Sequence, residues 1–199
     1  MKNDKITNIC VFASSSNFLS ECYYEDASEL GRLMGENGYN IVYGGSTLGL
    51  MWSCAEQVKK NGGLIYGVMP QRLVDMGCRT DNCDEFHLAE GMRDRKGKMD
   101  EISDAVIALA GGYGTLEELA EMIVQKQLGY NKKPIVILNT NGFYDNLLKF
   151  FDVIIEEKFA NKVIKNLYYI ASNPQDAIDY INDYVEPDMV ISKHEIYSR

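Results

Sequence analysis

The chain has 199 residues, with 20 lysine and arginine residues against 29 aspartate and glutamate residues, which gives a formal net charge of −9 at pH 7. This acidic balance argues against a nucleic-acid binder, because such a protein needs a basic face that displaces counterions from phosphates. Hydrophobic residues make up 46% and charged residues 25% of the sequence, which excludes disordered, collagen-like and coiled-coil chains. The length predicts a single domain over residues 1–199.

Nothing in the sequence predicts export or a membrane span. The apolar run near the start, residues 9–13, is short and suits a strand better than a signal peptide. No apolar stretch approaches the ~18 residues that a membrane-spanning helix needs. Because the chain has five cysteines, an odd number, and no export signal, we expect a reduced cytoplasmic protein.

The sequence does not predict a metal centre. It contains two histidines, His87 and His194, so a site with several histidine ligands is excluded. Cys78, Cys83 and His87 lie close together along the chain, but their spacing matches no common zinc pattern and a fourth ligand is missing. We therefore expect no metal, with Cys78 and Cys83 as loop residues.

Short β-rich runs alternate with helical patterns along the chain. Strands are expected at residues 6–13, 40–43, 64–69, 85–88, 105–109, 134–138 and 167–171. Helices are expected at residues 23–37, 48–60, 91–102, 115–129, 144–157 and 174–184, with residues 71–84 irregular and the tail from about 186 possibly extended. This alternation predicts an α/β fold: a single-domain, Rossmann-like, doubly wound parallel sheet with helices on both faces. Ligands of such folds bind at the carboxyl ends of the strands, where the strand order reverses.

Loops of small residues follow three of the expected strands. They are Ser14–Ser16, Gly44–Gly49 and Gly111–Thr115, and a helix is expected to start after each. Glycines let the backbone approach a ligand closely, and helix N-termini offer unpaired N–H groups to anions. The set favours a phosphate-bearing ligand, although glycines that merely form tight turns would give the same pattern. Neither the dinucleotide fingerprint nor the P-loop motif is present, which disfavours a dinucleotide-dependent oxidoreductase.

The helix expected at residues 91–102 carries an unusual face. Met92, Arg95, Lys96 and Met99 share one stripe at helical spacing, so two cations lie on the side that also carries apolar residues. Buried cations need an anionic partner, which predicts an anion site. The alternative is that both side chains extend past the methionines to water.

Glu118 has a structural explanation as well as a functional one. Thr115 and Glu118 match a capping box, in which the glutamate bonds back to the start of the helix. Glu118 also lies nearly opposite the expected packing stripe of Leu116, Leu119, Ala120, Ile123, Val124 and Gln127. Periodicity alone therefore explains Glu118 as a cap, and a functional role needs other evidence.

Several segments, in the same order, resemble motifs of one enzyme family. They are CVFASSS, VYGGSTLGLM, GMRDRKGKM, AGGYGTLEE and QLGYNKKPIVILNTNGFYDNLL, within residues 6–160. They resemble the Lonely Guy (LOG) family of cytokinin riboside 5′-monophosphate phosphoribohydrolases, once labelled lysine decarboxylases. The resemblance implies hydrolysis of the N-glycosidic bond of a cytokinin riboside monophosphate or AMP, giving free base and ribose 5-phosphate. It implies a homodimer, a small-molecule substrate and no cofactor.

The resemblance also implies roles for individual residues. Arg95 and Glu118 would be the catalytic pair. The substrate-binding residues would be Ser15, Gly44, Gly45, Gly49, Met92, Lys96, Gly111, Gly112, Tyr113, Gly114, Thr115, Leu116 and Glu117.

The chain departs from the family pattern at five positions. Ala110 replaces a proline and Ser46 a glycine, and Trp52, Ser14 and Gln71 stand where a small residue, a glycine and an acidic residue are common. These departures keep a second hypothesis open, a nucleotide-binding module without turnover. The stretch from residue 70 to residue 92, which contributes to the base pocket in the family, is also longer than usual, so base preference is not predicted.

Overall fold

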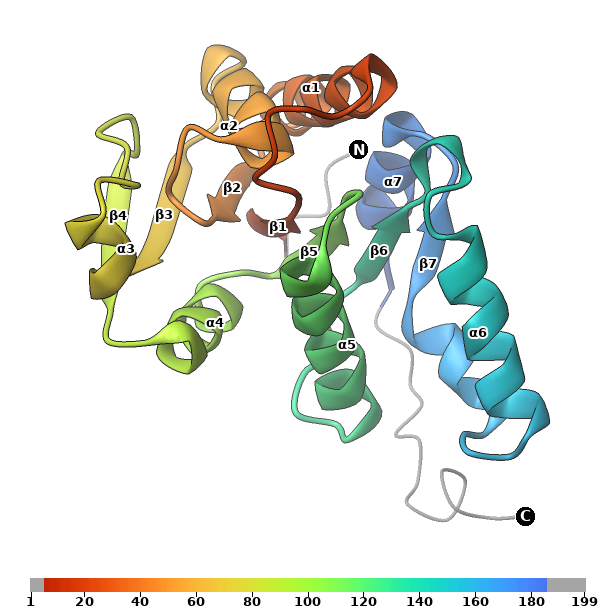
Figure 1. The fold of residues 1–199 in the computed structure, drawn as a ribbon. Coiled ribbons are helices and arrows are strands. Elements are labelled where there is room, and N and C mark those ends of the chain that lie inside the picture. The colour runs from red at the N-terminus through yellow and green to blue at the C-terminus, as the bar shows by residue number, and fades with distance from the viewer. Residues whose placement is uncertain (1–5, 186–199) are drawn as a thin grey trace.

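The computed structural model describes residues 6–185, so the tail from residue 186 lies outside the described residues. The described part contains one sheet of seven parallel strands in the order β4-β3-β2-β1-β5-β6-β7 (Figure 1). Every expected strand is present. The strands are β1 (Asn8–Phe12), β2 (Asn40–Tyr43), β3 (Ile65–Pro70), β4 (Glu85–Ala89), β5 (Ala105–Ala108), β6 (Ile135–Leu138) and β7 (Tyr169–Ala171).

Helices connect the strands, as the alternation predicts. The α-helices are α1 (Glu21–Glu36), α2 (Gly49–Lys60), α3 (Gln71–Asp75), α4 (Met92–Glu101), α5 (Tyr113–Gln127), α6 (Asp145–Glu156) and α7 (Pro174–Asn182), and two 3₁₀ turns are η1 (Thr140–Gly142) and η2 (Lys162–Leu167). The expectation of an irregular segment over residues 71–84 is wrong at its start, where α3 forms. A helix of five residues is too short to show a 3.6-residue period, and a hydrogen bond of 2.6 Å from Gln71 to Asp75 supports it locally.

The sheet is covered on both faces. Helices α1, α2 and α7 lie on one side, and α4, α5 and α6 on the other (Figure 1). Alternate residues of β1 face opposite sides: Ile9 and Val11 join the core under α1 and α2, whereas Cys10 and Phe12 join the core under α5. These two apolar cores confirm the doubly wound, Rossmann-like arrangement.

The strand order reverses at β1. This strand pairs with β2 on one side and with β5 on the other, with Phe12 opposite Ala108 at the carboxyl end. Beyond that pair, the Ser14 N–H donates to the Ala110 carbonyl at 3.1 Å, so the loops after β1 and β5 are joined directly. The reversal places the expected ligand crevice between these two loops.

Candidate functional site

A pocket of about 470 Å³ opens at the carboxyl edge of the sheet. Its volume is typical of small-molecule sites. Segments that follow β1, β2, β3 and β5 line it, together with α4. The lining residues are Ala13, Ser14, Ser15, Ser16, Gly44, Ser46, Leu48, Met51, Met69, Leu73, Cys78, Met92, Arg95, Gly112, Gly114, Thr115 and Glu118.

Arg95 and Glu118 form an ion pair in this pocket. Arg95 Nη1 lies 2.8 Å from Glu118 Oε1, and the two side chains are 11% and 10% exposed. Arg95 Nε also donates to the Val68 carbonyl at 3.1 Å. A Cβ atom on Gly44 would lie 2.9 Å from Arg95 Nη2, so the glycine makes room for the guanidinium. The anionic partner expected for Arg95 is thus Glu118 of the same chain.

The capping-box interpretation of Glu118 is wrong. Helix α5 begins at Tyr113, two residues earlier than expected, and Gly112 is its N-cap residue. Thr115 therefore lies inside the helix, and Glu118 sits on its buried face beside Leu119. The packing stripe is rotated from the expected one, because Ala120 and Val124 are exposed. A prediction from hydrophobic periodicity treats glutamate as polar and places it on the exposed face of the helix. Here a buried guanidinium group pairs with the carboxylate, so Glu118 lies on the buried face.

Burial also changes the acidity of this carboxyl group. It raises the pKa of Glu118 above the ordinary glutamate value, although Arg95 beside it acts in the opposite direction. A carboxyl group with a raised pKa exchanges protons closer to neutral pH, which suits general acid–base chemistry.

Lys96 lies next to Arg95 in sequence but does not line the pocket. Its ammonium group bonds to Glu117, and Glu121 Oε2 lies 2.5 Å from it. Burial lowers the pKa of Lys96, but the bonds to the two carboxylates outweigh this effect and raise it. Lys96 and Glu117 thus link α4 to α5 outside the pocket.

Helices α2 and α5 begin after two of the glycine-rich loops, and their first-turn amides are used differently. At α2, the Gly49 N–H donates to Asn17 Oδ1 at 2.8 Å and the Leu50 N–H donates to the Ser14 carbonyl at 2.9 Å. At α5, no side chain among residues 6–185 bonds to the first-turn amides, and Gly112, Gly114 and Thr115 line the pocket. Of these two helices, α5 is the one whose N-terminus is placed to bind an anion.

The pocket brings together eight of the residues singled out from the sequence: Ser15, Gly44, Met92, Arg95, Gly112, Gly114, Thr115 and Glu118. Seven others lie outside its lining: Gly45, Gly49, Lys96, Gly111, Tyr113, Leu116 and Glu117. Some of these shape the loops instead. Gly49 has a φ of +57°, and a Cβ atom there would lie 2.4 Å from the Ser14 carbonyl oxygen. Tyr113 is 91% exposed and does not line the pocket.

Sequence reasoning assigned no individual residue of one wall of the pocket to the site. This wall is apolar and is formed by Leu48, Met51, Met69, Leu73 and Cys78 from α2, β3 and the segment after β3. The rest is formed mainly by polar and small residues from the loops after β1, β2 and β5, together with Met92 and Arg95 of α4. A charged group and a flat apolar group can therefore bind in one cavity. Within residues 6–185, no cluster of three or more histidine, cysteine, aspartate or glutamate side chains could hold a metal ion.

Solved structures share this fold at low sequence identity. The molybdenum cofactor binding protein from Rippkaea orientalis matches with a TM-score of 0.68 and 24% identity, covering 90% of this chain and 97% of that one. The molybdenum cofactor carrier protein from Chlamydomonas reinhardtii matches with a TM-score of 0.66 and 22% identity, covering 88% and 96%. Likeness at this identity shows the fold alone. No helix described here is long and apolar enough to cross a membrane.

Sequence relatives are closer. The family model described as "Possible lysine decarboxylase" matches residues 51–181. Cytokinin riboside 5′-monophosphate phosphoribohydrolase LOG of Oryza sativa subsp. japonica is 36% identical over 184 residues, 92% of this chain and 76% of the relative. The Arabidopsis thaliana enzyme LOG1, of the same name, is 37% identical over 181 residues, covering 91% and 85%. The chain therefore belongs to the LOG family.

Proposed function

We propose that the protein hydrolyses the N-glycosidic bond of a nucleoside 5′-monophosphate, releasing the free base and ribose 5-phosphate. The observation that carries the proposal is the buried Arg95–Glu118 pair beside the uncapped N-terminus of α5 in one pocket. The names of the relatives support it, since they are phosphoribohydrolases of cytokinin riboside monophosphates.

The polar wall of the pocket binds the sugar phosphate of the substrate, and the apolar wall binds its base. The phosphate binds at the N-terminus of α5, at the amides around Gly112 and Gly114, where the helix dipole favours a negative charge. Ser15 and Thr115 supply hydroxyl groups to the sugar phosphate. The base lies against the apolar wall that includes Met69 and Leu73.

The chemical step breaks the bond between the anomeric carbon and the base. Cleavage of glycosides passes through a cation-like sugar, which a nearby carboxylate stabilises. Glu118 supplies that charge and accepts a proton from the attacking water. The water oxygen bonds to the anomeric carbon as the bond from that carbon to the base nitrogen breaks. The departing base nitrogen takes a proton from solvent water, and Glu118 returns its proton to solvent, so the step balances. Arg95 orients Glu118 through the hydrogen bond from its Nη1. The Nη2 group of the same guanidinium can then donate to the substrate.

A nucleotide-binding module without turnover is the alternative hypothesis. The departures from the family pattern at Ala110 and Ser46 are the reason to consider it. The turn at Ala110 is nevertheless closed, because its carbonyl accepts the hydrogen bond from Ser14. Ser46 lines the pocket, where its hydroxyl adds a polar group and removes none. These contacts favour the enzyme over the module.

The direct test measures the free base released from AMP and from isopentenyladenosine monophosphate. We expect release from at least one of them, since AMP and N6-prenylated substrates both fit the chemistry. Folded protein that binds either nucleotide but releases no base would support the module instead. Folded protein that neither binds nor cleaves them would overturn both hypotheses.

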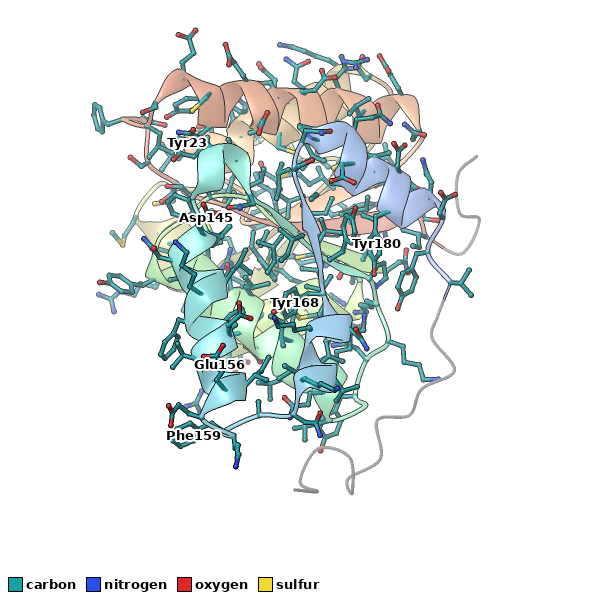
Figure 2. The ribbon with its side chains drawn as sticks, turned by 90° about the vertical axis from the view of Figure 1, so that its right-hand side faces the viewer. Tyr23, Asp145, Glu156, Phe159, Tyr168 and Tyr180 are labelled. Atoms are coloured by element: carbon teal, nitrogen blue, oxygen red, sulfur yellow. The ribbon has the colours of Figure 1, made fainter. Side chains whose placement is uncertain are left out.

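We also propose that the protein acts as a homodimer in the cytoplasm. Helices α5 and α6 cover the same sheet face. Exposed apolar side chains lie on both helices and on the residue that follows α5: Val124, Leu128, Phe150 and Val153. None of the α6 residues is fully buried, although its apolar residues share one face. Figure 2 shows α6 on the outside of the molecule, from Asp145 to Glu156. A second copy that covers this face would bury it.

A further inference from the structure

A buried tyrosine lies behind the turn that leads into α5. The Tyr144 side chain is 1% exposed, and its hydroxyl donates to the Leu109 carbonyl at 2.6 Å. Burial raises the pKa of this hydroxyl far above its usual range, so the group stays a neutral donor at every physiological pH. Leu109 directly follows β5 and precedes Ala110, Gly111 and Gly112.

The carbonyl groups of Leu109 and Ala110 each accept a hydrogen bond, and the two donors come from different neighbouring segments. Tyr144, from the segment after β6, bonds to the first, and the Ser14 N–H, from the loop after β1, bonds to the second. Two glycines then lead to the first residue of α5. These two bonds are the fixed points from which the anion-binding turn starts, because glycine itself imposes little conformation on the backbone.

Tyr144 is itself held firmly. Its backbone N–H donates to Asn139 Oδ1 at 2.7 Å, and Asn139 Nδ2 donates to Asp145 at 2.8 Å. The adjoining 3₁₀ turn is tied to α1, because the Thr140 hydroxyl bonds to Asp26 at 2.5 Å. The ring of Tyr23 from α1 also packs edge-on against Phe143, next to this turn, with 5.9 Å between the ring centroids (Figure 2 labels Tyr23). These contacts hold the Tyr144 side chain in one orientation. Its hydroxyl therefore loses little conformational freedom when it donates to the Leu109 carbonyl.

We propose that Tyr144 is a positioning residue for phosphate recognition, acting through the Leu109 carbonyl on the N-terminus of α5. This inference rests on the proposed function, since the ligand it concerns is the 5′-phosphate. Tyr144 does not line the pocket and touches no substrate. Its loss should therefore weaken ground-state binding of the phosphate and leave the chemical step at Glu118 unchanged.

The test compares Tyr144→Phe with a matched control, Tyr39→Phe. Tyr39 is also fully buried, and its hydroxyl also donates at 2.6 Å, but to Asn182 of α7, away from the pocket. We measure the dissociation constant for ribose 5-phosphate by calorimetry, the KM and kcat for base release, and the melting temperature. Asn139→Ala, which frees the Tyr144 backbone N–H but keeps the hydroxyl, is a second variant.

For Tyr144→Phe we expect KM and the ribose 5-phosphate dissociation constant to rise about tenfold, the scale of one well-placed hydrogen bond, with kcat within about twofold. Asn139→Ala should shift both constants in the same direction. Tyr39→Phe should lower the melting temperature to a similar extent with KM unchanged. An unchanged KM in Tyr144→Phe, a loss confined to kcat, or an equal rise in Tyr39→Phe would overturn the role of Tyr144 alone. Wild-type protein that neither binds ribose 5-phosphate nor releases base would overturn the proposed function and this role together.

Discussion

The carboxylate of Glu118 and the guanidinium of Arg95 are 2.8 Å apart in a pocket where both side chains are about nine-tenths buried. The pair joins the second turn of α5 to the middle of α4. A buried pair of this kind is expensive to desolvate, and replacing it by apolar residues is often neutral or stabilising. Its position in a cavity that can hold a small molecule is therefore better explained by function than by stability.

Replacing Glu118 by glutamine should abolish most turnover while keeping the fold. The glutamine oxygen can still accept the hydrogen bond from Arg95, but it supplies no negative charge and takes no proton. We expect kcat to fall by about 10²–10⁴-fold, the range for loss of a general base. Glu121→Gln, one turn along the same helix and outside the pocket, should stay within about twofold. Equal losses in the two variants would contradict a catalytic role for Glu118.

Arg95 and Arg93 offer a comparison at constant net charge. Arg95 lines the pocket, whereas Arg93 is exposed on the same helix. We expect Arg95→Ala to weaken AMP binding at least tenfold, because it removes a buried donor, and Arg93→Ala to change it about twofold at most. Calorimetry at two salt concentrations measures both. Equal effects would mean that the overall field of the protein, rather than a site, attracts the nucleotide.

The raised pKa of Glu118 predicts a pH dependence of stability. A carboxyl group whose pKa is higher in the folded state contributes stability below its unfolded pKa and loses it as the pH rises through the folded pKa. Relative to Glu118→Gln, the wild-type protein should thus become less stable as the pH increases over that interval. Denaturant unfolding of both proteins from about pH 4 to pH 8 measures the difference, and the usual range of glutamate sets its lower end. A difference that is independent of pH would show that the pKa is not raised.

The sequence was sufficient to predict the strands and their alternation with helices. Cys10 and Phe12 on one side of β1, and Ile9 and Val11 on the other, are all apolar, which is typical of a parallel strand buried on both faces. The position of the pocket could also be predicted, because loops of small residues follow the strands at the point where the strand order reverses, and ligands of this fold class bind there.

The details of the site depended on tertiary contacts that a sequence does not show. Arg95 and Lys96 share one helical stripe, but Arg95 meets Glu118 in the pocket, whereas Lys96 meets Glu117 and Glu121 outside it. Which of the neighbouring cations enters the cavity depends on where the carboxylates of α5 lie. Leu73 lies in the stretch of residues 70–92 that the family resemblance links to the base, but it could not be singled out because helix α3 is a single turn, too short for a periodic pattern.

The proposed homodimer can be tested on the exposed face of α6. Phe150 is 58% exposed there, and an aspartate in its place would have to be desolvated in a dimer. We expect wild-type protein to elute with the mass of two chains and Phe150→Asp to elute as one, measured by light scattering. Phe18→Asp, at a 96% exposed phenylalanine outside α5 and α6, should remain dimeric. A monomeric wild type would contradict the proposal.

Leu73 should influence which base the enzyme prefers. It reaches the pocket from α3, and shortening it removes apolar surface from the wall proposed to hold the base. An N6-prenyl group would lose more contact than an unsubstituted adenine, so Leu73→Ala should lower kcat/KM for isopentenyladenosine monophosphate about tenfold relative to AMP, the scale of one to two lost methylene contacts. Met76→Ala, in the same segment but 66% exposed and outside the pocket, should leave the ratio unchanged. The ratio of kcat/KM for the two nucleotides, measured in competition, cancels any loss of folded protein. If Leu73→Ala leaves this ratio unchanged, the base binds elsewhere in the cavity.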